Sequence, residues 1–320
     1  MLGDRKTNKI QVVQRRHLLD DIPRGRYAGY IGKPPDAYFE SPENLTATES
    51  LRFDPVHNRE AKLFLGVVDG EVITGPRLPD GRITRWVEGG VPLGISDDRH
   101  IVTIAGSRGG KGRSALIPNL ILLPSATSFL CIDPKGDIAR ATARWRADGL
   151  GQQTGILDPF GVAGDALQRF HVAFNPIDVL LRSDQRTFVP NSKLIADSLI
   201  TSGDVKDRHW DDCARSALSM LCSHVATHVN YEGYRKLVQV WHLISELATP
   251  DPNDPRRYWL EKELLANAAA GGTVRTAARQ FYDRTGGEFS SVLSNLRKQT
   301  DWLGIECMHT CLCGPSIDFR

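Results

Sequence analysis

The chain has no long apolar run and almost no imbalance of charge. The charge-free stretch 115–132 contains two prolines and several polar residues, which a bilayer-spanning helix would have to place in hydrocarbon. No apolar segment follows the charged residues Asp4, Arg5 and Lys6. The sequence therefore predicts neither a signal peptide nor a membrane anchor, and we expect synthesis and folding in the cytosol.

Composition narrows the class of protein. The 320 residues include 40 Lys and Arg against 38 Asp and Glu, with 41% apolar and 24% charged residues. Such a chain is typical of soluble globular proteins with one or two domains, which excludes disorder and fibrous repeats. A net charge of +2 is too small to coat the surface with positive potential, so any affinity for nucleic acid has to come from a local patch.

Cysteine is scarce and is not arranged in a metal-binding pattern. The six cysteines, in a chain without a secretory leader, are best interpreted as reduced thiols. Cys307, Cys311 and Cys313 surround His309, but a paired Cys-x-x-Cys is lacking and all four side chains are compressed into a few residues. We therefore predict no metal site.

The amino-terminal part divides into an arm and a small β unit. Residues 1–60 lack periodicity, and the first 30 hold seven Lys or Arg against three Asp or Glu, which predicts a poorly structured basic arm. Residues 61–95 alternate β-branched runs with turn residues. Asp69-Gly70 between two such runs predicts a hairpin, and Pro79-Asp80-Gly81 predicts a second turn.

Residues 96–188 show strands that alternate with helices. Apolar segments at 101–105, 129–133 and 155–158 read as strands, the first of them buried, and residues 138–147 predict a helix between the last two. This alternation is typical of an α/β fold with a parallel sheet, whose ligands bind where the strands end.

Helical periodicity replaces the strand pattern from residue 189 to 300. The clearest stripe falls at offsets 0, 4, 7, 8, 11 and 15 from Trp210, which is the spacing of one helix face. Comparable stripes run through 237–244 and, less clearly, through 258–268 and 289–296. We predict an all-helical domain over 189–300 and the start of a return to the α/β domain over 301–320.

The most specific motif is a glycine-rich loop between the first of these strands and a helix. Its backbone amides can surround an anion, the following helix points its positive dipole end at the phosphates, and a lysine can reach the β and γ oxygens. The first Gly and the Ser or Thr of a P-loop are replaced by Ala105 and Gly112, so the hydroxyl that usually holds Mg²⁺ is missing. The alternative to a phosphate-binding loop is a purely structural strand-to-helix turn with a surface lysine. The predicted nucleotide-binding residues here are Ala105, Gly106, Ser107, Arg108, Gly109, Gly110, Lys111, Gly112 and Arg113.

Two further turns follow strand ends. Asp133-Pro134-Lys135-Gly136-Asp137 places Asp133 where a carboxylate can approach a magnesium ion, although the same residues suit a tight turn in which Asp137 caps the next helix. Asp158-Pro159-Phe160-Gly161 repeats the pattern, and there we favour the turn. None of the three strand ends offers an Asp-Glu pair that could polarise water, so the sequence names no catalytic residue.

Arginine and aromatic residues occur together at 256–259 and 279–284. Guanidinium groups and aromatic faces can hold single-stranded nucleic acid. A solvated helix face with aromatic residues in the core explains both clusters equally well, and interleaved acidic residues argue against DNA contact.

Several segments resemble the type IV secretion coupling proteins, the TraG-type conjugative DNA-transfer family. They are residues 97–105 with the loop through Gly112, residues 117–120, the stretch 132–137 that is similar to that family's Asp-Pro-Lys-Gly-Glu motif, Phe174-Asn175-Pro176, and residues 209–215. The similarity extends over about 62–320, and a Gly-Lys-Gly ending of the loop is a family feature.

The resemblance implies an α/β fold in which a RecA-like P-loop nucleotide-binding domain, here with an incomplete parallel sheet, is interrupted by an all-helical domain. It implies ATP and Mg²⁺ as cofactors, with Lys111 and the amides of Gly109 and Gly110 on the phosphates and with Asp133 and Lys135 lining the site. It also implies a homo-hexamer that works peripherally at the cytoplasmic face of the inner membrane. Its partners would be the secretion channel and a relaxase with single-stranded DNA, or effector proteins.

This sequence departs from the family pattern at both ends. Members usually begin with membrane-spanning helices and carry an Asp-Glu-bearing strand that would lie beyond Arg320. We therefore expect a shortened chain that binds nucleotide, hydrolyses it poorly and exposes an apolar sheet edge. The alternative is a non-catalytic recruitment module with a vestigial loop, and a small-molecule kinase is disfavoured because no acceptor or lid signature follows the loop.

Overall fold

The computed structural model describes residues 40–79, 81, 83–98, 100–106, 109–201, 208–247, 258–284, 286–314 and 316–317. The chain divides into two units, Met1–Leu51 and Arg52–Arg320. The described part of the first unit is one short helix, α1 (Pro42–Ala47), and a 3₁₀ turn, η2 (Glu49–Leu51). Helix α1 begins here because Ser41 accepts a hydrogen bond from the Asn44 amide and Pro42 occupies the first helical turn. Most of the predicted basic arm lies outside the described residues.

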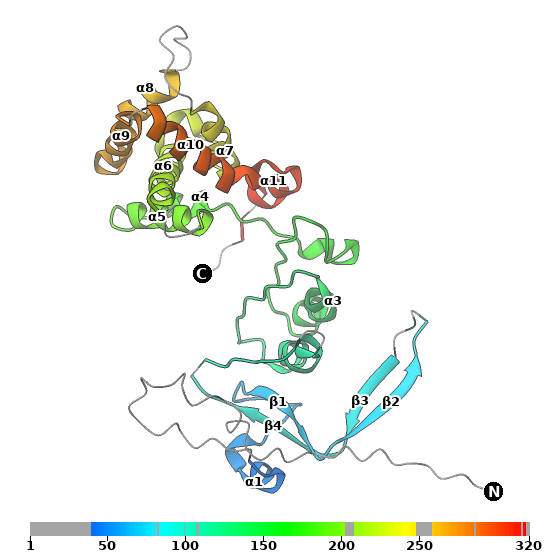
Figure 1. Cartoon of the computed structure of the whole chain (residues 1–320). Coiled ribbons are helices and arrows are strands. Elements are labelled where there is room, and N and C mark those ends of the chain that lie inside the picture. The colour runs from blue at the N-terminus through cyan, green and yellow to red at the C-terminus, as the bar shows by residue number, and fades with distance from the viewer. Residues whose placement is uncertain are drawn as a thin grey trace, which may run out of the picture. The chain divides into compact units, whose positions relative to one another are not determined.

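The small β unit is one long two-stranded ribbon with a break in the middle (Figure 1). Strand β1 (Leu63–Val68) pairs with β4 (Val91–Ile95), and β2 (Glu71–Arg77) pairs with β3 (Ile83–Glu88), both antiparallel. The prediction of an antiparallel unit is confirmed. The predicted hairpin at Asp69-Gly70 is wrong, because this dipeptide interrupts one side of the ribbon opposite Gly89-Gly90 instead of reversing the chain.

Positive φ angles explain the break. Asp69 has φ 56° and Gly90 has φ 75°, and a Cβ atom added to Gly90 would lie 2.5 Å from the carbonyl oxygen of Val68. The two sides of the ribbon therefore cross too closely for any other residue at Gly90. The chain reverses farther along, near Gly81, whose φ is 84°. This is the position of the second predicted turn, although Asp80 lies outside the described residues.

Asn119 fixes β1 to the helix that follows the glycine-rich loop. Helix α2 (Ile117–Leu122) continues a π-helical turn, η3 (Gly112–Leu116). The Asn119 side chain accepts a hydrogen bond from the Phe64 amide (2.7 Å) and donates one to the Phe64 carbonyl (2.9 Å), as a neighbouring strand would. Asn119 belongs to one of the segments that carry the family resemblance, and this bonding gives that residue a structural role.

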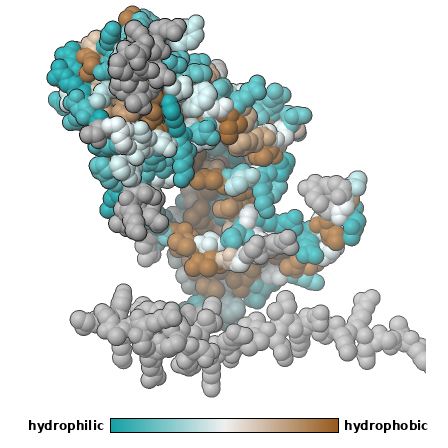
Figure 2. All heavy atoms as spheres, turned by 45° about the horizontal axis from the view of Figure 1, so that its top comes forward, coloured by the Kyte–Doolittle hydropathy of each residue, from teal (hydrophilic) through white to brown (hydrophobic). Residues whose placement is uncertain are grey.

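The predicted strands at 101–105 and 129–133 are wrong as regular structure. Both segments lie outside helices and strands, and their apolar side chains are largely exposed: 91% for Ile104, 84% for Leu130 and 86% for Ile132. A central parallel strand needs a hydrogen-bonded neighbour on each side, and the described residues supply none here. Hydrophobic residues appear accordingly on the surface in Figure 2. The apolar edge of a parallel sheet that the sequence predicts is therefore not formed by the described residues, which instead expose two apolar segments outside any strand.

Parallel pairing survives only as two isolated bridges among the described residues. Ile156 pairs with His171, and Ala173 pairs with Ser316, both parallel. The fold is thus a mixed α/β structure whose extended sheets are the two short antiparallel pairs. The helix predicted after 137 is confirmed as α3 (Asp137–Arg144), which a π-helical turn, η4 (Trp145–Gly149), extends.

Most of the buried apolar residues lie in a helical body. Its principal helix, α6 (Arg208–Thr227), buries Ala214, Ala217, Leu218, Leu221 and Val225, which confirms the stripe expected from the sequence. One continuous core contains buried residues from Ile177 to Leu312. The other helices of this body pack around α6 or on one another (Figure 1). They are α4 (Ile177–Leu181), α5 (Phe188–Leu199), α7 (Leu237–Glu246), α8 (Trp259–Ala266), α9 (Ala269–Tyr282), α10 (Gly286–Thr300) and α11 (Glu306–Cys313), with the 3₁₀ turns η6 (Val229–Tyr231) and η8 (Asp301–Gly304). Another 3₁₀ turn, η5 (Asp165–Phe170), lies outside this body and packs against α3, where Leu167 and Phe170 belong to a second, smaller core.

Asn175 joins the helical body to the extended segment before it. Its side-chain amide donates to the Arg235 carbonyl (2.8 Å) and to the Asp178 carboxylate (2.7 Å), and its oxygen accepts from the Leu237 amide (3.0 Å). Its backbone amide donates to the Ser316 hydroxyl at 2.7 Å. With 4% of its surface exposed, Asn175 directly connects three distant stretches of chain.

We expect Asn175→Ala to lower the free energy of unfolding by about 2–4 kcal/mol, because the buried Leu237 amide and Arg235 carbonyl each lose a partner. Urea unfolding followed by tryptophan fluorescence measures the change. Asn191→Ala is the matched control: the Asn191 amide makes one bond, to the Ser183 hydroxyl, and its loss costs about 0.5–1.5 kcal/mol. Equal losses in the two variants would contradict the role of Asn175.

Candidate nucleotide site

The glycine-rich loop forms a tight turn that runs directly into a helix. The Gly109 amide donates to the Gly106 carbonyl (3.1 Å), and the Ser114 amide donates to the Gly110 carbonyl (2.8 Å). Gly110 has φ 83°, in the left-handed region that favours glycine. The turn therefore ends at the start of η3, and the start of a helix is where backbone amides can hold an anion. Ser107 and Arg108 lie outside the described residues.

Lys111 folds back over its own loop. Its ammonium donates to the carbonyl of Ala105 (2.8 Å) and to that of Gly106 (3.3 Å). The side chains of Lys111 and Arg113 are exposed to solvent. The structure thus places Ala105, Gly106, Gly109, Gly110, Lys111 and Gly112 in one tight loop, with the Lys111 ammonium on the loop's own carbonyls.

Asp133 serves as the cap of α3. One carboxylate oxygen, Oδ2, accepts hydrogen bonds from the amides of Ile138 (2.8 Å) and Ala139 (2.9 Å). The expectation that Asp137 caps this helix is wrong, because its carboxylate instead pairs with Arg140 at 2.6 Å. Asp133 precedes the helix by several residues and reaches its amides because Gly136 turns the chain with φ 68°. No hydrogen bond between described residues links Asp133 or the exposed Lys135 to the glycine-rich loop.

The turn after residue 157 repeats this arrangement. Asp158 accepts hydrogen bonds from the amides of Val162 (3.0 Å) and Ala163 (2.7 Å), and Gly161 has the same φ of 68° as Gly136. Burial pushes the pKa of Asp158 upward, but hydrogen bonds from these amides and the nearby His171 outweigh it and hold the pKa below its ordinary value. The prediction that this motif is a turn is confirmed.

The two turns pack against each other. Arg140 donates to the Lys135 carbonyl at 2.8 Å and also to the Val162 carbonyl, so one guanidinium spans both turns. Beside them lies a cavity of about 270 Å³, lined by Asp133, Asp158, Leu130, Gly155, Val172 and Ile317 among others. The sequence predicted each turn separately, and the packing between them was missed because nothing in either motif indicates the other.

The Arg and aromatic cluster at 279–284 does not form a stacking surface. Phe281 is 1% exposed, and burial raises the pKa of the Tyr282 phenol far above its usual value. The Arg284 guanidinium lies 5.8 Å from the Phe281 ring centre and pairs with Glu288. These aromatic residues belong to the helical core, which favours the structural interpretation of residues 279–284. Arg256 and Arg257 lie outside the described residues.

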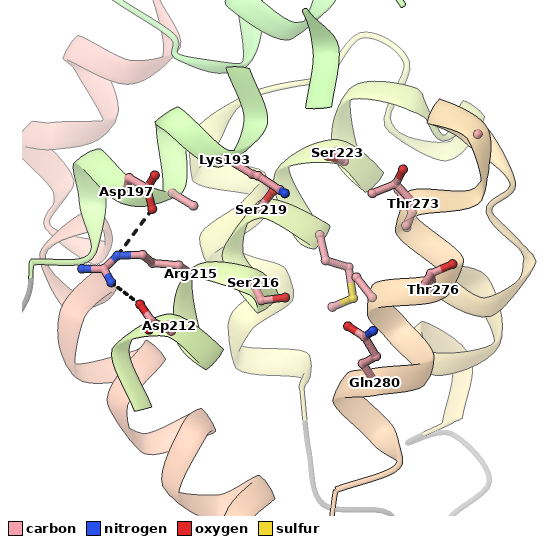
Figure 3. A pocket seen from close by; sticks show the side chains of 15 residues that line it. Lys193, Asp197, Asp212, Arg215, Ser216, Ser219, Ser223, Thr273, Thr276 and Gln280 are labelled. Atoms are coloured by element: carbon pink, nitrogen blue, oxygen red, sulfur yellow. Dashed lines mark hydrogen bonds and ion pairs between the residues drawn. The ribbon is translucent and has the colours of Figure 1, made fainter. Parts of the chain in front are cut away.

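A groove in the helical body was not predicted (Figure 3). It has a volume of about 500 Å³ between α5, α6 and α9. Arg215 forms ion pairs with Asp197 (3.5 Å) and Asp212 (2.7 Å) at one end. Hydroxyl and amide side chains line much of the rest, and they are Ser216, Ser219, Ser223, Thr273, Thr276 and Gln280. Isolated Ser and Thr residues carry no sequence signal, so only the packing of the helices reveals the groove.

Comparison with known proteins decides the family. The family model described as type IV secretory system conjugative DNA transfer matches residues 60–319. The chain belongs to this family. The match covers the β ribbon, the glycine-rich loop, both Asp-Pro turns and the helical body, and it confirms the resemblance seen in the sequence.

Curated relatives agree with this assignment. The chain is 28% identical over 204 residues to a conjugal transfer protein TraG of Escherichia coli, which covers 62% of this chain and 30% of the relative. It is 23% identical over 277 residues to the type IV secretion system-coupling protein VirD4 of Bartonella quintana (strain Toulouse), covering 79% of this chain and 40% of the relative. The chain thus spans less than half the length of these relatives.

No solved structure matches the chain. Within the part of the chain that the structure describes, no helix has the length and apolar character needed to cross a bilayer.

Gly136→Ala and Gly161→Ala test the packing of the two turns. Both residues have φ 68°, which costs an alanine about 1–2 kcal/mol. A Cβ atom at Gly136 would lie 2.6 Å from the Val162 carbonyl oxygen, whereas one at Gly161 meets nothing within 4 Å. We expect Gly136→Ala to lower the free energy of unfolding by about 1–3 kcal/mol more than Gly161→Ala, as measured by urea unfolding. Similar values for the two variants would show that the turns do not pack as described.

Proposed function

We propose that this chain is the nucleotide-binding and substrate-recruiting part of a type IV secretion coupling protein, and that it binds ATP with Mg²⁺ through the loop at 105–113. The observation that carries the proposal is the position of Lys111: its ammonium lies on the carbonyls of a tight glycine turn, at the start of a helix. The family match over 60–319 supports the same conclusion. In this proposal the chain has a RecA-like P-loop fold.

Each part of the loop has a distinct role in the proposed binding. The amides of Gly109 and Gly110 and the first amides of η3 donate to phosphate oxygens. The Lys111 ammonium leaves its two backbone carbonyls, which are neutral acceptors, for the charged β and γ phosphates, which form stronger hydrogen bonds. Binding thus exchanges a weak interaction within the loop for a strong one with the ligand.

Magnesium has fewer protein ligands here than in a P-loop with Ser or Thr. A Cβ atom added to Gly112 meets nothing within 4 Å, so the site has room for the missing side chain but no hydroxyl. The Asp133 oxygen Oδ2 is occupied by two helix amides, which leaves Oδ1 to approach the ion or its waters.

The cellular role follows from the relatives' names. Proteins named for conjugal transfer and for type IV secretion coupling include TraG and VirD4. We propose accordingly that the whole protein delivers a relaxase with single-stranded DNA, or effector proteins, to the secretion channel. We further propose that it works as a homo-hexamer at the cytoplasmic face of the inner membrane.

Lys111→Ala is expected to weaken ATP binding about 10- to 100-fold, because a charge-assisted hydrogen bond of about 1.5–3 kcal/mol is lost. Equilibrium titration with a fluorescent ATP analogue and Mg²⁺ measures the affinity. Lys262→Ala is the control, since Lys262 is an exposed lysine on α8, away from the loop. Unchanged affinity in Lys111→Ala, or equal losses in both variants, would remove the loop from the site.

A second candidate function is recruitment by the helical body with a vestigial loop. The groove between α5, α6 and α9 favours it, because hydroxyl and amide groups with one ion-paired end can hydrogen-bond an extended peptide (Figure 3). Ser216→Trp places bulk at the exposed edge of this groove. We expect this variant to retain several-fold less relaxase–DNA complex on the immobilised chain while ATP affinity stays unchanged. Unaltered retention would exclude the groove as the recruiting surface.

A further inference from the structure

Three side chains with metal-binding atoms meet where α6 and α10 begin. His209 and Cys213 lie one turn apart on α6, and Glu288 lies in the first turn of α10. The His209 nitrogen Nε2 is 3.8 Å from the Cys213 sulfur and 3.7 Å from the Glu288 oxygen Oε1. All three atoms lie within 4.8 Å of one another. Imidazole, thiolate and carboxylate are together the ligand types that zinc prefers.

The two separations from the His209 nitrogen are close to what zinc requires. Tetrahedral coordination with bonds of about 2.0–2.3 Å separates a nitrogen from an oxygen by about 3.3 Å and from a sulfur by about 3.6 Å. The observed separations exceed these values by a few tenths of an ångström. The side chains of His209 and Glu288 are 64% and 36% exposed, so rotation about their own bonds can close the difference without moving a helix.

The helices that carry the ligands are held in place independently of any metal. Buried Leu221 on α6 and buried Val292 and Leu296 on α10 belong to the same core, and the Asn295 amide donates to the Asp211 carboxylate at 2.9 Å. Arg284 pairs with the Glu288 oxygen Oε1 at 3.3 Å and so orients this carboxylate from outside. The arrangement therefore presents three ligands on a rigid base with an outer-shell partner.

A second cluster, His224, His228 and Glu263, has similar spacing but does not suit a metal. The Asn267 amide donates to the His224 nitrogen Nδ1 at 3.0 Å, and the Ala269 amide fixes the orientation of Asn267 by donating to its oxygen. The proton of His224 must then be on Nε2, where it is donated to Glu263 at 3.2 Å. The nitrogen that faces the carboxylate is thus protonated and unavailable as a ligand. The contacts of His209 with Cys213 and Glu288 place no such constraint on its ring.

We propose that His209, Cys213 and Glu288 bind one zinc ion, with water in the fourth coordination position. Zinc displaces the thiol proton of Cys213, which leaves to solvent, and the resulting thiolate and the Glu288 carboxylate balance the charge of the ion. The metal ties the first turn of α6 to the first turn of α10. This site is separate from the glycine-rich loop and does not depend on nucleotide binding.

The test is metal titration of the full chain after chelation and removal of the chelator. We expect the parent chain to bind one equivalent of Zn²⁺, with affinity lowered at least tenfold by Cys213→Ser, His209→Gln or Glu288→Gln. Co²⁺ in place of Zn²⁺ is expected to give a thiolate charge-transfer band that Cys213→Ser abolishes and His209→Gln weakens. Because His209 is exposed, its variant carries the test even if Cys213→Ser does not fold.

Two controls separate this site from other thiols and imidazoles. Cys131→Ser removes an exposed cysteine elsewhere, and His228→Gln removes a histidine of the second cluster; both are expected to leave zinc affinity unchanged. The proposal is overturned if the parent chain binds no zinc at micromolar protein. It is equally overturned if Cys213→Ser and His209→Gln bind as tightly as the parent, or if only His228→Gln loses affinity.

Discussion

The side chain of Asn175 is the constraint on which the junction of this molecule depends. Its amide and carbonyl groups take the place of backbone partners for Arg235 and Leu237, and its own backbone amide donates to Ser316. A side-chain amide both donates and accepts hydrogen bonds in defined directions. Asn175 therefore fixes both where α7 begins and where the carboxyl-terminal segment meets the residues around 175. A purely apolar contact could hold these segments together but could not set their register, because hydrophobic burial has no direction.

The helices of the fold were predictable from the sequence, whereas the predicted parallel sheet was wrong. The stripe on α6 is visible because a helix satisfies its own backbone, so its pattern depends only on which face is buried. The segments at 101–105 and 129–133 have the composition of strands, but a strand acquires its hydrogen bonds from other parts of the chain. Without neighbours, Ile104 and Ile132 remain exposed although their sequence is apolar. An apolar, β-branched composition thus shows that a segment can form a strand, and only hydrogen bonding to a neighbouring strand makes it one.

The candidate site divides in the same way. The loop at 105–113 and the two Asp-Pro turns follow from local residues, because tight turns are encoded by the glycines and carboxylates within them. The sequence did not reveal that Asp133 would cap the helix in place of Asp137, since both lie within reach and only the turn at Gly136 decides between them. Glu288 could not be assigned to His209 and Cys213, because helix packing alone brings α10 to α6.

The break in the β ribbon has a consequence for how this part of the molecule can change. The ladder of hydrogen bonds is interrupted at Asp69-Gly70 and Gly89-Gly90. The register in which β2 pairs with β3 is therefore independent of the register in which β1 pairs with β4. Lengthening or replacing the β2–β3 hairpin would therefore leave the β1–β4 pair and its hydrogen bonds to Asn119 intact. The β2–β3 hairpin can therefore change in length and sequence while the structure of the β1–β4 pair is kept.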